Sequence, residues 1–122
     1  MAGFTNAKAK SILDAEFPTT GATTHVAYST NGSSEWAGLA RTPVGASGWK
    51  AATSASPSVK KNANTITSAG ASSGGTVTHT ALFSASSSGT QITDWEALAS
   101  SKTLALGDKL EFAEDALTVS LD

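Results

Sequence analysis

Pro18 divides the 122-residue sequence into two unlike patterns. Before it, residues 6–16 are rich in Ala and Lys, which favour a helix, and Thr5 is a suitable N-cap. Pro18 ends this helix because the residue before a proline is forced out of the α region. After it, Thr, Val and Ser alternate in short runs interrupted by Gly, a pattern of many short strands. The sequence therefore predicts one short N-terminal helix followed by a β-fold.

The pattern after Pro18 divides into about seven or eight short strands with turns roughly every ten residues. Such spacing predicts a mainly β fold, a compact antiparallel β-sandwich or barrel. A chain of this length forms one domain, here with an N-terminal helical arm at residues 1–17 and a β-domain at 19–122. In the strand expected at 76–84, alternate side chains point to opposite faces. The expected strands cover residues 24–30, 35–42, 47–53, 63–68, 76–84, 91–97, 109–113 and 116–121.

Small side chains dominate the composition. The chain has 22 Ala, and Ser and Thr together add 35 residues. Large apolar side chains are scarce, so burial contributes little stabilisation per residue. We therefore expect partner subunits to cover part of the apolar surface.

Composition and charge exclude several classes of protein. With no Cys there is no disulfide framework and no thiolate nucleophile, and two His without Cys make a metal centre unexpected. A net charge of −2 argues against nucleic-acid binding driven by phosphates. No apolar run approaches the ~20 residues that span a bilayer, and no apolar stretch follows Lys8 and Lys10 as in a secretory signal. We expect no cofactor, no metal, no nucleic-acid partner and no membrane partner.

Catalytic residues are also not indicated. His25 and His79 lie on expected strands without a ligand or triad partner nearby, so each is read as a sheet histidine instead of a general base. No Gly-x-Ser-x-Gly elbow is present. Two pairs of acidic residues could in principle act as the two carboxylates of a glycosidase, but we interpret them as solvated surface charges. The sequence therefore predicts no enzyme. These pairs are Asp94 with Glu96 and Glu114 with Asp115.

The three tryptophans, Trp36, Trp49 and Trp95, leave three interpretations open. In a core poor in Leu and Phe, Trp fills space. Trp is also enriched at protein–protein interfaces, where it supplies a large buried area. Stacked aromatic rings are a third possibility, since glycan-binding surfaces use them. We carry all three tryptophans as candidate interface residues.

The N-terminal helix has a short apolar face formed by Phe4, Ile12, Leu13 and Phe17. These side chains are too few to hold a helix by local energy alone. Our first hypothesis is that residues 1–17 serve attachment to another subunit or to a partner protein. The alternative is that the helix closes one end of the chain's own β-fold.

The order of the motifs resembles a family of short virion structural proteins from tailed phages, variously described as tail fibre-like or as minor capsid (decoration) proteins. Each motif alone is an ordinary strand or turn, but together they follow the family's order from end to end. The departures from the family pattern fall in turns. The similar segments are residues 1–6, 11–14, 37–41, 76–85, 101–104, 107–108 and 117–122.

This resemblance implies a structural and non-enzymatic role. We expect a capsid decoration protein that binds the assembled head shell, with the major capsid protein and further copies of itself, as a homotrimer, for partners. Its expected location is the capsid surface of the virion, after synthesis in the host cytoplasm. The alternative is a tail fibre or tail-tip protein that binds a host receptor through Trp36 or Trp95. The number of copies per virion separates the two.

Overall fold

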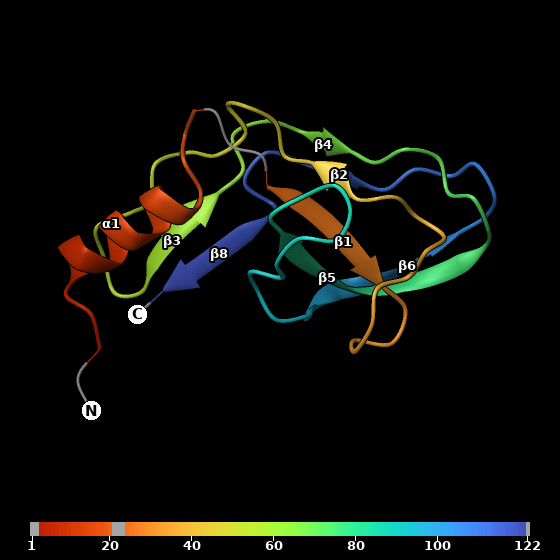
Figure 1. Ribbon diagram of the computed structural model, residues 1–122, viewed down its shortest axis with the longest axis horizontal. Coiled ribbons are helices and arrows are strands. Elements are labelled where there is room, and N and C mark those ends of the chain that lie inside the picture. The colour runs from red at the N-terminus through yellow and green to blue at the C-terminus, as the bar shows by residue number, and fades with distance from the viewer. Residues whose placement is uncertain (1–2, 21–23, 122) are drawn as a thin grey trace. The chain divides into compact units, whose positions relative to one another are not determined.

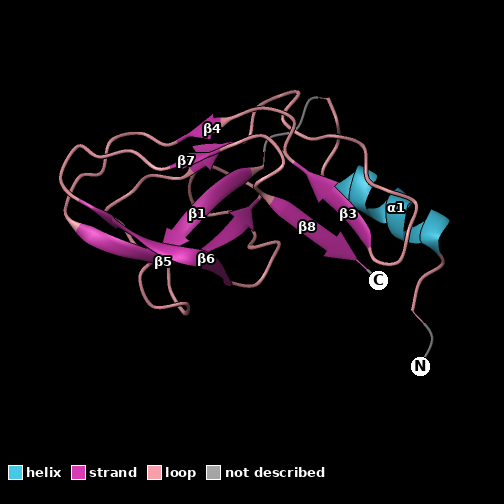
Figure 2. Ribbon diagram, turned by 180° about the vertical axis from the view of Figure 1, so that it is seen from behind, coloured by secondary structure: helices cyan, strands magenta, loops and turns pink. Residues whose placement is uncertain are grey.

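The fold is shown in Figure 1 as a computed structural model that describes residues 3–20 and 24–121. This part of the chain contains one helix and eight strands, and the strand pairs with a defined register are antiparallel (Figure 2). The expected mainly β fold with one short N-terminal helix is confirmed. The elements are α1 (Asn6–Glu16), β1 (His25–Ser29), β2 (Thr42–Pro43), β3 (Ser58–Lys61), β4 (Ile66–Thr67), β5 (Gly75–Phe83), β6 (Glu96–Leu104), β7 (Glu111–Phe112) and β8 (Thr118–Leu121).

The chain folds into two compact units, each built from separated segments. Unit 1 comprises Met1–Ala22, Val44–Thr65 and Phe112–Asp122, and unit 2 comprises Thr23–Pro43 and Ile66–Glu111. Helix α1 is grouped with the strands on which it packs, and the expected division into an arm at 1–17 and a β-domain at 19–122 stays a prediction. The expectation of one domain over residues 1–122 stays a prediction.

In unit 1, helix α1 lies against the two-stranded sheet of β3 and β8. The Thr5 hydroxyl caps the helix by accepting a hydrogen bond from the Lys8 backbone N–H at 3.2 Å. Three side chains one turn apart, Ala9, Leu13 and Phe17, are buried. The helix is therefore a part of the core of its own unit.

Unit 2 is built around a four-stranded sheet with the order β2-β1-β5-β6. Strand β1 pairs along its whole length with β5, and its residues Val26 to Ser29 are buried. The Tyr28 hydroxyl bonds the Thr42 hydroxyl at 2.6 Å, and burial raises the pKa of Tyr28 to about 12. The central strands thus form the core of this unit, and β2 and β6 form its edges.

Several strand predictions were wrong in detail. The strand expected at 35–42 is reduced to Thr42–Pro43, because the side chains of Glu35 and Arg41 meet and fold this segment into a loop. The strand expected at 47–53 is a single bridge between Trp49 and Asn62. The strand expected at 91–97 begins only at Glu96 and continues to Leu104. Strand β3 was not expected, since its inward side chains are polar.

The alternation predicted for residues 76–84 is also incomplete. Val77 and Ala81 are buried, as expected for one face, but Thr80 and Leu82 on the other face are buried too. The register between β5 and β6 shifts between Val77 and His79. Both differences depend on tertiary packing, which the periodicity of the sequence does not predict.

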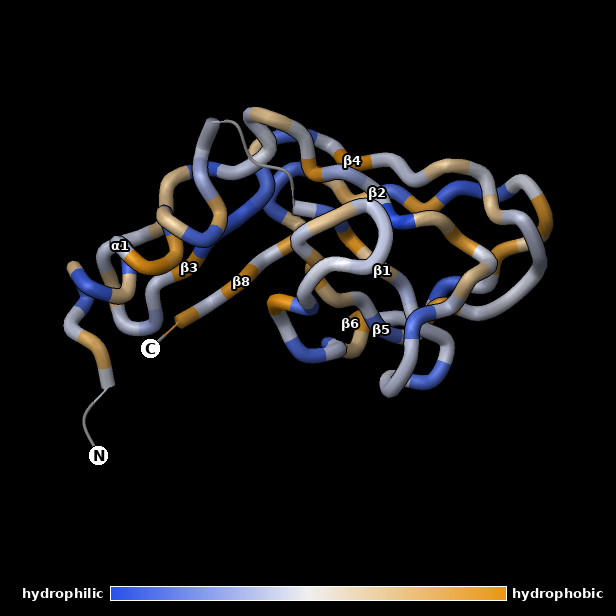
Figure 3. The backbone as a smooth tube through the Cα atoms, in the orientation of Figure 1, coloured by the Kyte–Doolittle hydropathy of each residue, from blue (hydrophilic) through white to orange (hydrophobic). Residues whose placement is uncertain are grey.

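Apolar residues are dispersed along the chain. Figure 3 shows the hydrophobic colour in short stretches separated by hydrophilic ones. In the described residues, no helix has both the length and the apolar character that a membrane span requires.

Candidate functional site

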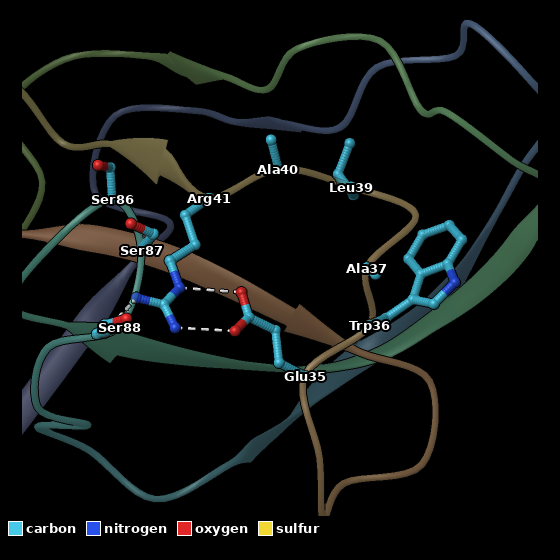
Figure 4. Close-up of a pocket in the computed structure, with 9 residues that line it drawn as sticks. All are labelled: Glu35, Trp36, Ala37, Leu39, Ala40, Arg41, Ser86, Ser87 and Ser88. Carbon is cyan, nitrogen blue, oxygen red and sulfur yellow. Dashed lines mark hydrogen bonds and ion pairs between the residues drawn. The ribbon is translucent and has the colours of Figure 1, made fainter.

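A surface depression of about 310 Å³ lies in unit 2, between two loops (Figure 4). One loop contains residues 35–41 and the other residues 86–88. We call this depression the Arg41 pocket. It is lined by Glu35, Trp36, Ala37, Leu39, Ala40, Arg41, Ser86, Ser87 and Ser88.

Arg41 organises the pocket. Its guanidinium donates two hydrogen bonds to the carboxylate of Glu35, from Nε at 2.9 Å and from Nη2 at 2.8 Å. The remaining terminal nitrogen, Nη1, donates to the backbone carbonyls of Ala85 and Ser88, at 3.0 and 2.7 Å. The guanidinium carbon lies 3.9 Å from the centre of the Phe83 ring. Arg41 therefore holds the loop of residues 86–88, which we call the serine loop, against the 35–41 loop.

The charge of Arg41 is not available to a ligand. Its side chain is 7% exposed, and the hydrogen bond with Glu35 raises its pKa. A bidentate Arg–carboxylate pair is planar and geometrically specific. The arrangement therefore supports a rigid, nearly neutral surface and not an anion-binding site.

The serine loop has a defined shape. Ser88 and Gly89 both have positive φ angles, 53° and 71°. The Ser84 hydroxyl accepts a hydrogen bond from the Thr90 N–H at 2.9 Å, and the Ser84 N–H donates to the Thr90 carbonyl at 3.0 Å. The loop thus presents three consecutive exposed serines, residues 86–88, on a closed turn.

Trp36 is half-buried, and its indole points away from the three serines (Figure 4). It covers two glycines: a Cβ atom at Gly38 would lie 2.2 Å from the ring, and one at Gly75 would lie 2.6 Å from it. The ring therefore packs on backbone at the start of β5. Trp95 is half-buried as well, and its ring centre lies 6.0 Å from that of Phe83.

The other interface candidates lie in unit 1, and three of them are buried within it. Leu13, Phe17 and Trp49 are buried, and the rings of Phe17 and Trp49 lie 5.2 Å apart. They pack in the core of their own unit, and their role at an interface stays a prediction. Phe4 is 52% exposed and Ile12 is half-buried, so their role at an interface stays a prediction, as it does for Trp36 and Trp95.

The comparison with known families decides the class of the protein. Residues 17–120 match the family described as Podophage GP4 fiber I protein gp80. The chain belongs to this family. No curated protein matches the chain significantly.

The resemblance to tailed-phage virion structural proteins is thereby confirmed. The matched range covers most of both units but begins at Phe17. The N-terminal similarity, in residues 1–6 and 11–14, therefore lies outside it. As a member of this fibre protein family, the chain is a structural component of a phage virion.

Of the residues considered for catalysis in this fibre-family protein, the two histidines, Asp94 and Glu96 belong to unit 2, and Glu114 and Asp115 belong to unit 1. His79 bonds the Thr78 hydroxyl through Nδ1 at 2.8 Å, and the buried Nδ1 of His25 has no hydrogen-bond partner. Glu114 and Asp115 both pair with Lys50 at 2.7 Å. Asp94 and Glu96 are exposed. Among the described residues, no three His, Cys, Asp or Glu side chains are grouped so as to hold a metal ion.

Sequence reasoning missed the most connected polar group of unit 1. The Asp14 carboxylate accepts hydrogen bonds from Lys10 at 2.6 Å, from the fully buried Lys60 at 2.7 Å and from the Ala52 N–H at 2.8 Å. Burial alone would raise the pKa of Asp14, but these hydrogen bonds outweigh it and lower the pKa well below its usual range. The only local signal was the spacing of Lys10 and Asp14, one helical turn apart.

Proposed function

We propose that the chain is a subunit of the fibre apparatus of a short-tailed phage and that it acts without catalysis. One observation carries the proposal: the family match to a fibre protein extends over residues 17–120. A structural role also agrees with the interactions at the Arg41 pocket. There the charged groups are engaged with one another and none is left as an acid, base or nucleophile.

The proposal extends to the contact that such a subunit makes. We propose that the Arg41 pocket faces the host and accepts a neutral surface saccharide. The three serine hydroxyls and the Glu35 carboxylate offer donors and acceptors on a preformed surface, as hydrogen bonding to sugar hydroxyls requires. Because Arg41 is already paired, the saccharide class that fits is uncharged.

Capsid decoration is the second candidate. It is favoured by the absence of a shaft in the described residues, where the longest helix has 11 residues and the longest strands have nine. In that case the major capsid protein is the partner and the capsid surface the location. Self-association as a homotrimer fits both candidate functions. The molecular mass of the purified protein in solution would give the number of subunits.

Copy number tests the proposal. We expect quantitative mass spectrometry of purified virions to give few copies relative to the major capsid protein, and gold-labelled antibodies to mark the tail. Copies in numbers comparable to the shell protein, with label over the head, would refute the fibre assignment and establish decoration.

A variant pair tests the host contact. In Ser87→Ala the pocket loses a hydroxyl, whereas Ser101→Ala removes an exposed hydroxyl from β6 outside the pocket. We expect weaker binding of the purified Ser87→Ala protein to host cells and to isolated host polysaccharide, with Ser101→Ala at the wild-type level. Equal binding by both variants would contradict the saccharide site and leave the fibre assignment intact.

A further inference from the structure

The turn that follows β1 contains Asn31 and Gly32, a dipeptide with its own covalent chemistry. In an Asn–Gly pair, the backbone nitrogen of the glycine can attack the side-chain carbonyl carbon of the asparagine. A C–N bond forms, the glycine nitrogen loses its proton, and the side-chain amide leaves as ammonia. Water then opens the resulting succinimide to aspartate or isoaspartate. The reaction needs no reagent other than water.

Both reacting groups are engaged in this structure. The Gly32 N–H donates to the Ser29 hydroxyl oxygen at 2.9 Å. The Asn31 side-chain oxygen accepts backbone hydrogen bonds from Ser33 at 2.9 Å and from Ser34 at 3.0 Å. It also accepts from the Ser29 hydroxyl at 3.1 Å, and the Asn31 amide nitrogen donates to the Ser34 hydroxyl at 3.2 Å.

These contacts oppose the cyclisation in two ways. The attacking nitrogen must give up its proton, which is held between it and Ser29. The side-chain carbonyl carbon of Asn31 must also reach that nitrogen, and five hydrogen bonds restrain the Asn31 side chain. Ser29 is fully buried at the end of β1, and its hydroxyl also accepts a hydrogen bond from the Asn31 N–H at 3.2 Å, so the end of the strand holds the turn.

The turn does not easily accept a residue with a side chain in place of Gly32, although such a residue would slow the reaction at Asn31. Gly32 has a φ angle of 78°, which favours glycine. A Cβ atom there would also lie 2.8 Å from the His79 ring. The turn therefore requires the residue that makes Asn31 vulnerable.

We propose that Asn31 is a latent deamidation site and that Ser29 is the positioning residue that suppresses the reaction in the folded protein. Conversion would remove the amide donor to Ser34 and add a negative charge four residues before Glu35. Isoaspartate would also lengthen the backbone inside the turn. Deamidation would thus disturb the loop that leads into the Arg41 pocket.

The test follows the amide of Asn31 during incubation at mildly alkaline pH, by peptide mapping with mass spectrometry that separates aspartate from isoaspartate. Native protein, protein unfolded in urea, and the variants Ser29→Ala and Ser29→Thr are compared. Asn62 and Asn64, which precede Ala and Thr, serve as internal references.

We expect unfolded protein to lose the Asn31 amide faster than native protein. Ser29→Ala should lose it about fivefold faster than wild type, the factor that one net hydrogen bond supplies. Ser29→Thr, which keeps the hydroxyl, should remain close to wild type. Equal rates in native and unfolded protein would overturn the proposal, and this comparison holds even if Ser29→Ala fails to fold. A folded Ser29→Ala with the wild-type rate would overturn the role of Ser29.

Discussion

Both units have few large apolar residues, and in each of them one charged side chain makes several hydrogen bonds. The charge of this side chain, which we call the hub, is opposite in the two units. In unit 1 an anion is the hub: Asp14 accepts hydrogen bonds from Lys10, Lys60 and the Ala52 N–H. In unit 2 a cation is the hub, because Arg41 donates to Glu35 and to two backbone carbonyls. Each hub joins segments that are distant in sequence. Where burial contributes little, charge-assisted hydrogen bonds connect the pieces of a small fold.

The two hubs differ in how far their charged partners are exposed to water. Lys60 has no exposed surface, so it depends on Asp14 for its charge partner. The side chain of Glu35 is 33% exposed, so water can replace part of what Arg41 provides. Unit 1 should therefore be the more sensitive of the two.

The largest effect should follow from Asp14→Ala. A buried ammonium without its partner costs about 3–5 kcal/mol in the free energy of unfolding. Denaturant titration measures this loss. Lys10→Ala is the matched control, since it removes an exposed donor to the same carboxylate and should have only a small effect. If the two variants unfold at similar denaturant concentrations, Asp14 is not the hub of unit 1.

Arg41→Ala should have a smaller effect, about 1.5–3 kcal/mol, the value of hydrogen bonds to charged groups. It should also release the serine loop, so that amide hydrogen exchange at residues 85–90 becomes faster. Arg41→Lys should not restore the loop, because an ammonium cannot reproduce the bidentate pair with Glu35. Unchanged exchange in Arg41→Ala would show that the serine loop is ordered by its own turn.

Acid should weaken the anion hub. The pKa of Asp14 is lowered from 3.8 by folding, so its stabilisation is present above that value and is lost as the pH falls toward the folded-state pKa. Between pH 7 and pH 3 this single group should cost about 1 kcal/mol of the unfolding free energy. Asp14→Asn should lack this part of the acid dependence. An identical acid profile in wild type and Asp14→Asn would contradict the lowered pKa.

The sequence predicted the elements that depend on local chemistry. The helix between Thr5 and Pro18 and the strands expected at residues 24–30 and 76–84 follow from capping, proline and alternation, and they are present as α1, β1 and β5. The predictions that were wrong depend on contacts between residues far apart in the sequence. Nothing local indicates that Lys60 finds Asp14, or that Arg41 turns back to Glu35 and prevents a strand.

The candidate site was less predictable than the fold. Trp36 was singled out, but its ring covers Gly38 and Gly75, and the polar groups of the pocket come from serines that read as an ordinary loop. Phe17 and Trp49 are interface candidates by sequence, and both are buried in unit 1, because apolar faces look alike whether they meet the same chain or another. Only the tertiary fold distinguishes these cases.

The smallest effect on stability should come from the exposed ion pairs of Lys50 in unit 1. Lys50 pairs with both Glu114 and Asp115 at 2.7 Å, but all three side chains are 40% exposed or more. Exposed pairs gain little because water and salt screen them. We expect Lys50→Ala to leave the denaturant midpoint unchanged within error at physiological salt, in contrast to Asp14→Ala. A clear loss in Lys50→Ala that disappears at high salt would mean that surface pairs, and not only buried hubs, hold unit 1 together.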